Sequence, residues 1–313
     1  MEKNKIIVSG SSGFIGQALV ARLLAEQRKV HAFVRNPRFI DSEKVAATSL
    51  LKPEDWLSVM RQCSVFIHCA ARAHCSEGYG TTALAKFRKA NTDLTMMLAR
   101  QAAMAGVRRF IFLSSIGVNG NDSGTTPFRP NDPVNPQTPY AVSKYEAELV
   151  LHEIAQQFGL EVVIIRPPLV YGVGAPGNFA ALLRLARRAW PLPLAAINQN
   201  KRSFVAIDNL IDLIVTCIER PAAAGQTLLV SDGEDVSTAE LVQQLRWALG
   251  QPARLFAVPI KCLEWGARLV NKPELFQSLC GSLQVDIADT QRLLGWQPII
   301  SMKEGLKRAV GSG

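Results

Sequence analysis

The 313-residue sequence predicts an α/β fold in which helices cover both faces of a doubly wound, parallel sheet. Three observations lead to this prediction. Short apolar runs alternate with amphipathic helical patterns through the first half of the chain, as in parallel strands joined by right-handed helical crossovers. The first apolar run ends in a glycine-rich turn. Pro and Gly interrupt the second half more often, which predicts a smaller, mixed α/β region there.

The predicted elements follow one another in a regular order. The expected strands are Lys5–Ser9, Val30–Val34, Val65–His68, Arg109–Ser114, Val162–Arg166, Ser203–Ala206 and Thr227–Ser231. The expected helices are Phe14–Glu26, Pro53–Gln62, Phe87–Ala105, Tyr140–Phe158, Asn209–Glu219 and Thr238–Leu249. Two of these helices have N-terminal signals. Asp208 is a cap for the fifth helix, and Ser237 with Glu240 predicts a capping box for the sixth.

The glycine-rich turn has the spacing G-x-x-G-x-x-G, at Gly10, Gly13 and Gly16. It lies between a strand and an amphipathic helix, the setting in which a helix N-terminus binds a pyrophosphate. There Gly10 permits the tight turn, Gly13 lets the phosphates approach, and Gly16 lets helix and strand pack closely. We therefore expect residues 1–170 to form a dinucleotide-binding Rossmann domain. Residues 171–313 would mainly bind substrate and be partly interleaved with the sheet.

The composition limits the functional classes. With 48% hydrophobic and 19% charged residues, the chain is typical of soluble globular proteins. No apolar run reaches the ~20 residues of a membrane span, and we expect no signal peptide because the first predicted strand starts at Lys5. Six cysteines without a C-x-x-C pair predict reduced thiols in the cytoplasm. The net charge of +9 is not accompanied by a recognised nucleic-acid-binding motif. We therefore expect the protein to bind an anionic small molecule and no nucleic acid.

A second set of residues points to proton transfer. Tyr140 and Lys144 are four residues apart and share one face of the predicted helix. An ammonium group beside a phenol favours the phenolate, so Lys144 is expected to lower the pKa of Tyr140 and make it an acid or base. Ser115 follows the carboxyl end of a strand, where ligands of open α/β sheets bind. Its hydroxyl would hold a substrate oxygen against Tyr140.

With these residues, nearly the whole chain resembles the extended short-chain dehydrogenase/reductase family, in particular its nucleotide-sugar epimerase and 4-keto reductase branch. The matching segments are residues 10–16, the H-C-A-A sequence at 68–71, Asn91, and the R-P-P-L-V-Y-G sequence at 166–172. The resemblance implies that Ser115, Tyr140 and Lys144 are catalytic. It also implies cofactor contacts for Gly10, Gly13, Phe14, Ile15, Gly16, Ala70, Ala71, Asn91, Tyr140, Lys144 and Pro167.

The substrate side rests on two further matches. The resemblance implies that Asn178 and Arg202 contact the diphosphate of a UDP-sugar, together with Ser115 at the sugar. An arginine fork suits phosphate geometry. The alternatives left open are a turn residue for Asn178 and a solvated surface charge for Arg202. No metal site is expected.

Two departures from the family pattern discriminate among activities. Ile116 and Gly117 replace the Asp-Glu pair of sugar-nucleotide dehydratases and cannot move a proton, which argues against a 4,6-dehydratase. Arg35 stands at the end of the second strand, about 20 residues beyond the glycines, where NAD-binding loops usually carry an acid. A guanidinium there suits a 2′-phosphate, so the cofactor is NAD(P) with NADP(H) favoured. Stacking of Arg35 over adenine, without cofactor preference, is the alternative.

Together these observations predict an NAD(P)-dependent oxidoreductase acting at C4 of a UDP-sugar. Because of Arg35, a UDP-4-keto-6-deoxy-N-acetylhexosamine reductase of the UDP-N-acetylquinovosamine dehydrogenase type comes first, and resemblance alone places it in surface-polysaccharide (lipopolysaccharide) synthesis. The alternative is a UDP-glucose or UDP-N-acetylglucosamine 4-epimerase with bound NAD. A remote alternative is a non-catalytic, cofactor-binding regulator.

The resemblance also implies a homodimer. The apolar stretch 255–270, which contains Trp265, is expected to pack in the core or in that dimer. Docking on a membrane or on another partner is the alternative for this stretch.

Overall fold

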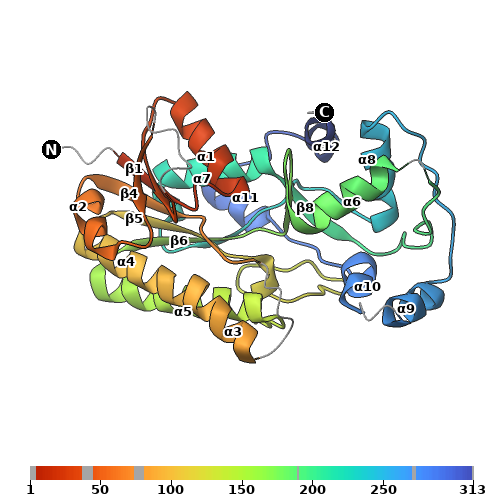
Figure 1. Ribbon diagram of the computed structural model, residues 1–313, viewed down its shortest axis with the longest axis horizontal. Coiled ribbons are helices and arrows are strands. Elements are labelled where there is room, and N and C mark those ends of the chain that lie inside the picture. Colours follow the sequence, from red (N-terminus) through yellow and green to blue (C-terminus); the bar gives the residue numbers. More distant parts are fainter. Residues whose placement is uncertain (1–4, 37–44, 74–80, 189, 270–272, 312–313) are drawn as a thin grey trace.

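A computed structural model describes residues 5–36, 45–73, 81–188, 190–269 and 273–311. Its main sheet has seven parallel strands in the order β3-β2-β1-β4-β5-β6-β9 (Figure 1). Their bounds are β1 (Lys5–Ser9), β2 (Lys29–Val34), β3 (Ala46–Ser49), β4 (Cys63–His68), β5 (Arg109–Leu113), β6 (Glu161–Arg166) and β9 (Thr227–Leu229). The predicted doubly wound α/β fold is confirmed. The strand order reverses beside β1, and ligands of such sheets bind at the carboxyl ends near that point.

Helices cover both faces of this sheet. One face packs against α1 (Phe14–Ala25), α7 (Ile207–Glu219) and α11 (Ala288–Leu294). The other packs against α2 (Trp56–Met60), α4 (Leu94–Met104) and α5 (Pro139–Phe158). Successive residues of β1 point to opposite faces, since Ile6 and Val8 belong to the first core and Ile7 to the second. Strands buried on both sides explain the near-continuous apolar runs in the sequence.

Two predicted helix features differ in the structure. The helix expected over 87–105 is divided into α3 (Thr81–Phe87), a π-helical turn (Arg88–Asp93) and α4. The expected cap of α7 is wrong, because α7 begins at Ile207 and Asp208 lies inside its first turn. There the Asp208 carboxylate pairs with Arg308 at 2.9 Å. The capping box of Ser237 and Glu240 is confirmed at the start of α8 (Thr238–Ala248).

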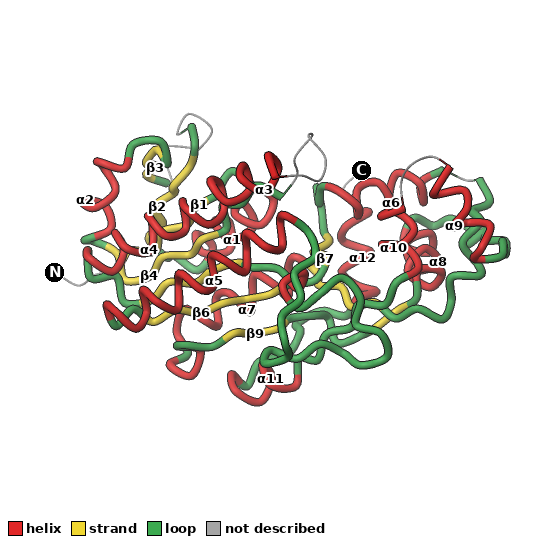
Figure 2. The backbone as a smooth tube through the Cα atoms, turned by 90° about the horizontal axis from the view of Figure 1, so that it is seen from below, coloured by secondary structure: helices red, strands yellow, loops and turns green. Residues whose placement is uncertain are grey.

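The remaining elements gather beyond the carboxyl ends of the large sheet. A second sheet consists of β7 (Leu169–Tyr171), β8 (Arg202–Ala206) and β10 (Asp235–Val236). Its helical neighbours are α6 (Gly177–Arg187), α8, α9 (Ile260–Leu269), α10 (Pro273–Cys280) and α12 (Met302–Val310). In Figure 2 the large sheet's strands run side by side toward this part. However, β9, α7 and α11 also come from the second half of the sequence and pack on the large sheet.

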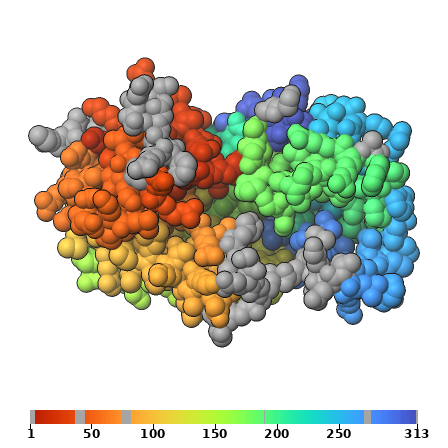
Figure 3. Space-filling model, in the orientation of Figure 1, coloured from red at the N-terminus to blue at the C-terminus, as the bar shows by residue number. Residues whose placement is uncertain are grey.

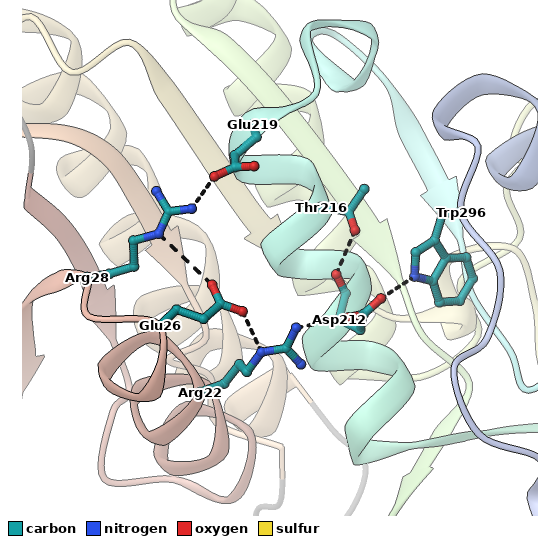
Figure 4. Close-up of polar contacts among 7 residues, drawn as sticks. All are labelled: Arg22, Glu26, Arg28, Asp212, Thr216, Glu219 and Trp296. Carbon is teal, nitrogen blue, oxygen red and sulfur yellow. Dashed lines mark hydrogen bonds and ion pairs between the residues drawn. The ribbon is translucent and has the colours of Figure 1, made fainter.

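A polar network joins α7 to the first helix (Figure 4). Arg22 on α1 lies 3.1 Å from the carboxylate of Asp212 on α7. The same carboxylate accepts the indole N–H of Trp296 at 3.0 Å, and Trp296 is only 4% exposed. Arg28, just beyond α1, pairs with Glu219 at the end of α7. Asp212 is therefore the point at which three distant segments of the chain meet.

Asp212→Ala is expected to lower the free energy of unfolding by about 1–3 kcal/mol, because it leaves the buried Trp296 N–H without an acceptor. Asp212→Asn keeps a carbonyl oxygen at this position and is the matched control, with a clearly smaller loss. Urea unfolding curves of the three proteins measure both effects. Equal losses in the two variants would contradict the importance of the indole hydrogen bond.

Candidate active site

The glycine-rich turn after β1 leaves no space for larger side chains. Gly10 has a φ of +72°, and a Cβ at this position would lie 2.6 Å from the backbone nitrogen of Ala70. A Cβ on Gly16 would lie 2.1 Å from the carbonyl oxygen of Gly10. The turn is closed by a hydrogen bond from the N–H of Gly13 to the carbonyl of Gly10, at 2.9 Å. Its backbone can therefore face a ligand directly.

This turn borders a pocket of about 590 Å³, within the usual size range of small-molecule sites. The structure brings five predicted cofactor residues together around it: Gly10, Gly13, Arg35, Ala70 and Ala71. The further lining residues, which were not among the predicted cofactor contacts, are Ser12, Val34, Leu50, Cys69, Arg72, Ala73, Ala90 and Leu94. Arg72 is a second arginine at the pocket, directly after the H-C-A-A segment. Two guanidinium groups make this pocket suitable for phosphate.

Other predicted cofactor residues lie around the pocket rather than in its described lining. The buried Asn91 side chain accepts the N–H of Arg72 at 2.8 Å and donates to the Ser143 hydroxyl at 2.9 Å, so it ties the loop after β4 to α5. The Pro167 carbonyl accepts the N–H of Ile116 at 3.0 Å, which joins the segments after β5 and β6.

Phe14 and Ile15 open α1 and pack against two different apolar clusters. Phe14 packs with the apolar cluster around Tyr171, and its ring lies 3.5 Å from the point that a Cβ on Gly172 would occupy. Ile15 packs on the core beneath α1 and α7. Both side chains thus fix the helix whose N-terminus faces the pocket.

Ser115 and Tyr140 lie on neighbouring turns. Ser115 precedes a short 3₁₀ turn, and its Oγ accepts the N–H of Gly117 at 3.1 Å. A Cβ on Gly117 would lie 3.4 Å from both the Ser115 Oγ and the Ala141 Cβ, so this turn contacts the first turn of α5. Tyr140 is in that first turn, with its ring edge-on to Phe87. The structure therefore places the segment that carries Ser115 next to the first turn of α5, which carries Tyr140.

Lys144 is 1% exposed, and its ammonium lies over the ring of Phe112, 4.0 Å from the centroid. Burial lowers the pKa of Lys144 to about 7, against the opposing effects of Glu148 and Cys69. Burial raises the pKa of Tyr140 to about 12. The expected lowering of the Tyr140 pKa by Lys144 is thus not found, because desolvation of the phenolate dominates and the ammonium is directed to Phe112.

A buried chain of hydrogen bonds runs beneath the pocket. The His68 ring contacts the hydroxyls of Ser9 on β1 and Thr95 on α4, the latter at 3.0 Å. The Thr95 hydroxyl donates to the carbonyl of Asn91, so it accepts from His68 Nε2, and the Ser9 hydroxyl donates to Nδ1. Burial lowers the pKa of His68 to about 3, which keeps the ring neutral. This chain aligns the glycine strand with the π-helical turn.

A buried ion pair connects the catalytic helix to two strand ends. Glu148 on α5 and Arg166 at the end of β6 approach to 2.6 Å and form a second contact of 3.0 Å. The Ser114 hydroxyl donates to Glu148, and Arg166 donates to the side-chain oxygen of Asn119 at 3.0 Å. Sequence reasoning missed this cluster, although Glu148 follows Lys144 by one helical turn. The pair holds α5 against the segments that carry Ser115 and Pro167.

The two predicted diphosphate residues have different surroundings. Asn178 is exposed in the first turn of α6. Arg202 begins β8 and donates to the carbonyl of Gly281 at 3.0 Å, and burial lowers its pKa. Arg202 is thus no solvated surface charge, although it already has one backbone partner.

The structure also bears on metals, membranes and disulfides. In the described ranges, no group of three or more His, Cys, Asp or Glu side chains could hold a metal ion. None of the described helices is long and apolar enough to cross a bilayer. Among the described residues, no disulfide is formed by Cys63, Cys69, Cys217, Cys262 or Cys280, while Cys75 lies outside the described residues.

Comparisons with known proteins support the resemblance found in the sequence. The NAD dependent epimerase/dehydratase family matches residues 6–231. The UDP-glucose 4-epimerase of Vibrio cholerae is 44% identical over 308 residues, which cover 97% of this chain and 93% of that protein. This chain belongs to the NAD-dependent epimerase/dehydratase family. It is therefore an enzyme of the extended short-chain type, and the non-catalytic alternative is not supported.

Solved structures agree with the fold of this epimerase/dehydratase family member. The UDP-glucose 4-epimerase of Thermotoga maritima, solved with UDP-glucose, has a TM-score of 0.79 at 21% identity, covering 98% of this chain and 97% of that one. MoeE5, solved with UDP-glucuronic acid and NAD, has a TM-score of 0.78 at 21% identity, covering 98% of both chains. Both likenesses confirm the Rossmann-type architecture.

The buried lysine predicts a pH dependence of stability. Its pKa is about 7 in the folded protein against an ordinary value of 10.5, so between these values the unfolded chain binds a proton that the folded chain does not. The free energy of unfolding should therefore rise with pH across this window, by at most about 1.4 kcal/mol per pH unit. Lys144→Met removes the titrating group and should lack this rise. Urea unfolding of both nucleotide-free proteins from pH 7 to about pH 10 measures the difference. Parallel curves would contradict the assigned burial of the ammonium.

Proposed function

We propose that this protein is a UDP-hexose 4-epimerase that works with bound NAD on UDP-glucose or UDP-N-acetylglucosamine. The observation that carries the proposal is the 44% identity to the Vibrio cholerae UDP-glucose 4-epimerase over nearly the full length of both chains. The sequence prediction put a 4-keto reductase first and the epimerase second. The relatives favour the epimerase, whereas the case for the reductase depends on Arg35 alone.

The pocket at the glycine-rich turn fits a nicotinamide dinucleotide. A Cβ at Gly10 or Gly16 would meet neighbouring backbone atoms, so the bare backbone at these positions can face a ligand directly. Arg35 and Arg72 add positive charge to the same lining. The family's NAD dependence and the NAD bound to MoeE5 support NAD as this cofactor. When bound, it would accept a hydride from C4 of the sugar and return it.

The side chains around Ser115 suit the proton chemistry of this reaction. Oxidation at C4 breaks the C–H and O–H bonds, and reduction from the opposite face forms them again with no net redox change. Tyr140 would take the hydroxyl proton and give it back. The Ser115 Oγ accepts the N–H of Gly117, so its own hydrogen remains available for the sugar oxygen. Lys144, whose pKa is about 7, can hold or release a proton at neutral pH, one helical turn after Tyr140.

Arg35 supports a second candidate function. Its exposed side chain lines the pocket at the end of β2, where a 2′-phosphate would favour NADP(H). NADP(H) would suit reduction of a UDP-4-keto-6-deoxy-N-acetylhexosamine, the reaction of a UDP-N-acetylquinovosamine dehydrogenase type enzyme. Both reactions use Ser115, Tyr140 and Lys144 in the same roles.

The region 171–313 would mainly supply the substrate side of the site. Arg202 is the stronger diphosphate candidate, because its guanidinium is largely shielded from water. In the described structure the guanidinium donates to the Gly281 carbonyl, and its other N–H groups could donate to a phosphate. Asn178 stays in the proposal as an exposed residue at the start of α6.

A homodimer and a role in surface-polysaccharide synthesis in the cytoplasm also remain proposals that rest on the resemblance. For the homodimer, α4 and α5 pack side by side and expose Met97, Met104 and Leu149, with exposed fractions of 40%, 68% and 44%. Exposed apolar side chains on two adjacent helices are suited to pairing with a second copy.

The purified protein should interconvert UDP-glucose and UDP-galactose, or the corresponding N-acetylhexosamine pair, without added cofactor. Tyr140→Phe should lower this rate by about 10²–10⁴-fold while dinucleotide binding is retained, because only the proton-transferring hydroxyl is lost. Tyr145→Phe, on the same helix, is the matched control and should remain active. Chromatography of the sugar nucleotides measures the rate. NADPH consumption with a UDP-4-keto-6-deoxy sugar, and no interconversion, would overturn the epimerase in favour of the reductase.

A further inference from the structure

The far end of the molecule, away from the dinucleotide pocket, exposes unusually large apolar side chains. Trp265 and Leu269 on α9 are 66% and 65% exposed. Ile260, the first residue of α9, is 43% exposed, and Phe256, which precedes the helix, is 47% exposed. No described residue of α9 is buried. Trp190, 70% exposed, follows α6 at the same end. The sequence predicts that stretch 255–270 packs in the core or in a dimer. Packing in the core of this chain is not found for most of its described part, and packing in a dimer stays a prediction.

The helical spacing of α9 gives it two distinct sides. Leu263 is packed against the apolar cluster of Leu192, Leu194, Ile197 and Val242. Trp265 is about 200° further around the helix at 100° per residue, and Lys261 and Leu269 are four residues to either side of it. The outward side therefore presents an apolar pair, Trp265 and Leu269, with Lys261 and Arg268 beside it. We call Phe256, Lys261, Trp265, Arg268 and Leu269 the α9 surface.

The chain next to the α9 surface also carries aromatic and basic side chains. The backbone around Leu192 runs beside Arg254 and Phe256, with hydrogen bonds of 3.0 Å in both directions. This brings Trp190, whose ring lies 5.8 Å from the Arg188 guanidinium, to the neighbouring strip of chain. Figures 1 and 3 show these green and blue segments together at the end of the molecule opposite the red and orange N-terminal segments, and Figure 2 labels β2 and β3 at that opposite end.

The charge of this end indicates what it binds. Residues 182–191 and 252–269 contain six basic side chains, Arg184, Arg187, Arg188, Arg254, Lys261 and Arg268, against one acidic side chain, Glu264. Glu264 is 2.6 Å from Arg268 in an exposed pair that a competing anion can exchange at little cost. Tryptophans with basic side chains beside them are typical of helices that lie in the interface of an anionic bilayer.

We propose that the α9 surface docks this enzyme peripherally on an anionic phospholipid bilayer. Trp265 and Leu269 enter the headgroup region, and Lys261, Arg268 and Arg254 contact lipid phosphates. None of the residues of the α9 surface is among those that line the dinucleotide pocket, so docking through this surface does not use the pocket's lining. This inference does not depend on which UDP-sugar the enzyme uses.

Vesicle flotation with the full chain tests the proposal. The protein should float with vesicles of phosphatidylcholine and phosphatidylglycerol, stay behind with phosphatidylcholine alone, and be released by high salt. The double variant Lys261→Glu with Arg268→Glu, and separately Trp265→Ser with Leu269→Ser, should each reduce the partition constant by at least about tenfold. Activity on sugar nucleotides in solution should be unchanged.

Arg61→Glu with Phe158→Ser is the matched control, since these residues are exposed in the dinucleotide half. This variant should float like the unchanged protein. Absence of flotation, or equal loss in the control, would overturn the proposal. Sedimentation showing self-association that Trp265→Ser with Leu269→Ser abolishes, without lipid binding, would overturn it in favour of a second copy of this chain. Circular dichroism of each variant excludes misfolding as the cause.

Discussion

Glu148 and Arg166 form an ion pair whose side chains are only 2% and 6% exposed, and the parts of the candidate active site meet at it. Removing water from two charges is costly, so such a pair persists only where hydrogen bonds satisfy the remaining lone pairs and protons. Ser114 and Asn119 supply these bonds. Because the four residues come from α5, β6 and the segment around the end of β5, the pair fixes where Tyr140, Ser115 and Pro167 lie.

The same helix that carries the ion pair carries the chemistry. Tyr140, Lys144 and Glu148 recur every four residues along α5, so one row of side chains runs from the phenol to the buried carboxylate. Burial lowers the pKa of Lys144 and so disfavours its charged form, whereas the Glu148 carboxylate raises this pKa. The proton-transfer group and the structural ion pair are therefore coupled through a single helical face. A change at Glu148 is transmitted both to the position of α5 and to the charge state of Lys144.

Local patterns predicted the parts of the fold and site that depend on neighbours in the sequence. The apolar runs gave β1 with its correct bounds, and the glycine spacing gave a turn whose Gly10 and Gly16 admit no Cβ. Contacts between distant segments were beyond such patterns, including Glu148 with Arg166 and His68 with Ser9. The lower pKa expected for Tyr140 also failed, because burial depends on packing that spacing does not reveal.

The most direct measurement is a double-mutant cycle on the ion pair, with Glu148→Leu, Arg166→Met and both together. Each single variant should lose about 3–5 kcal/mol of unfolding free energy, because it leaves one charge buried without its partner. The double variant should regain much of this stability. It should nevertheless turn over sugar nucleotides slowly, since Ser114 and Asn119 have lost the groups that hold the strand ends. Additive losses of stability, or full turnover in the double variant, would contradict the account.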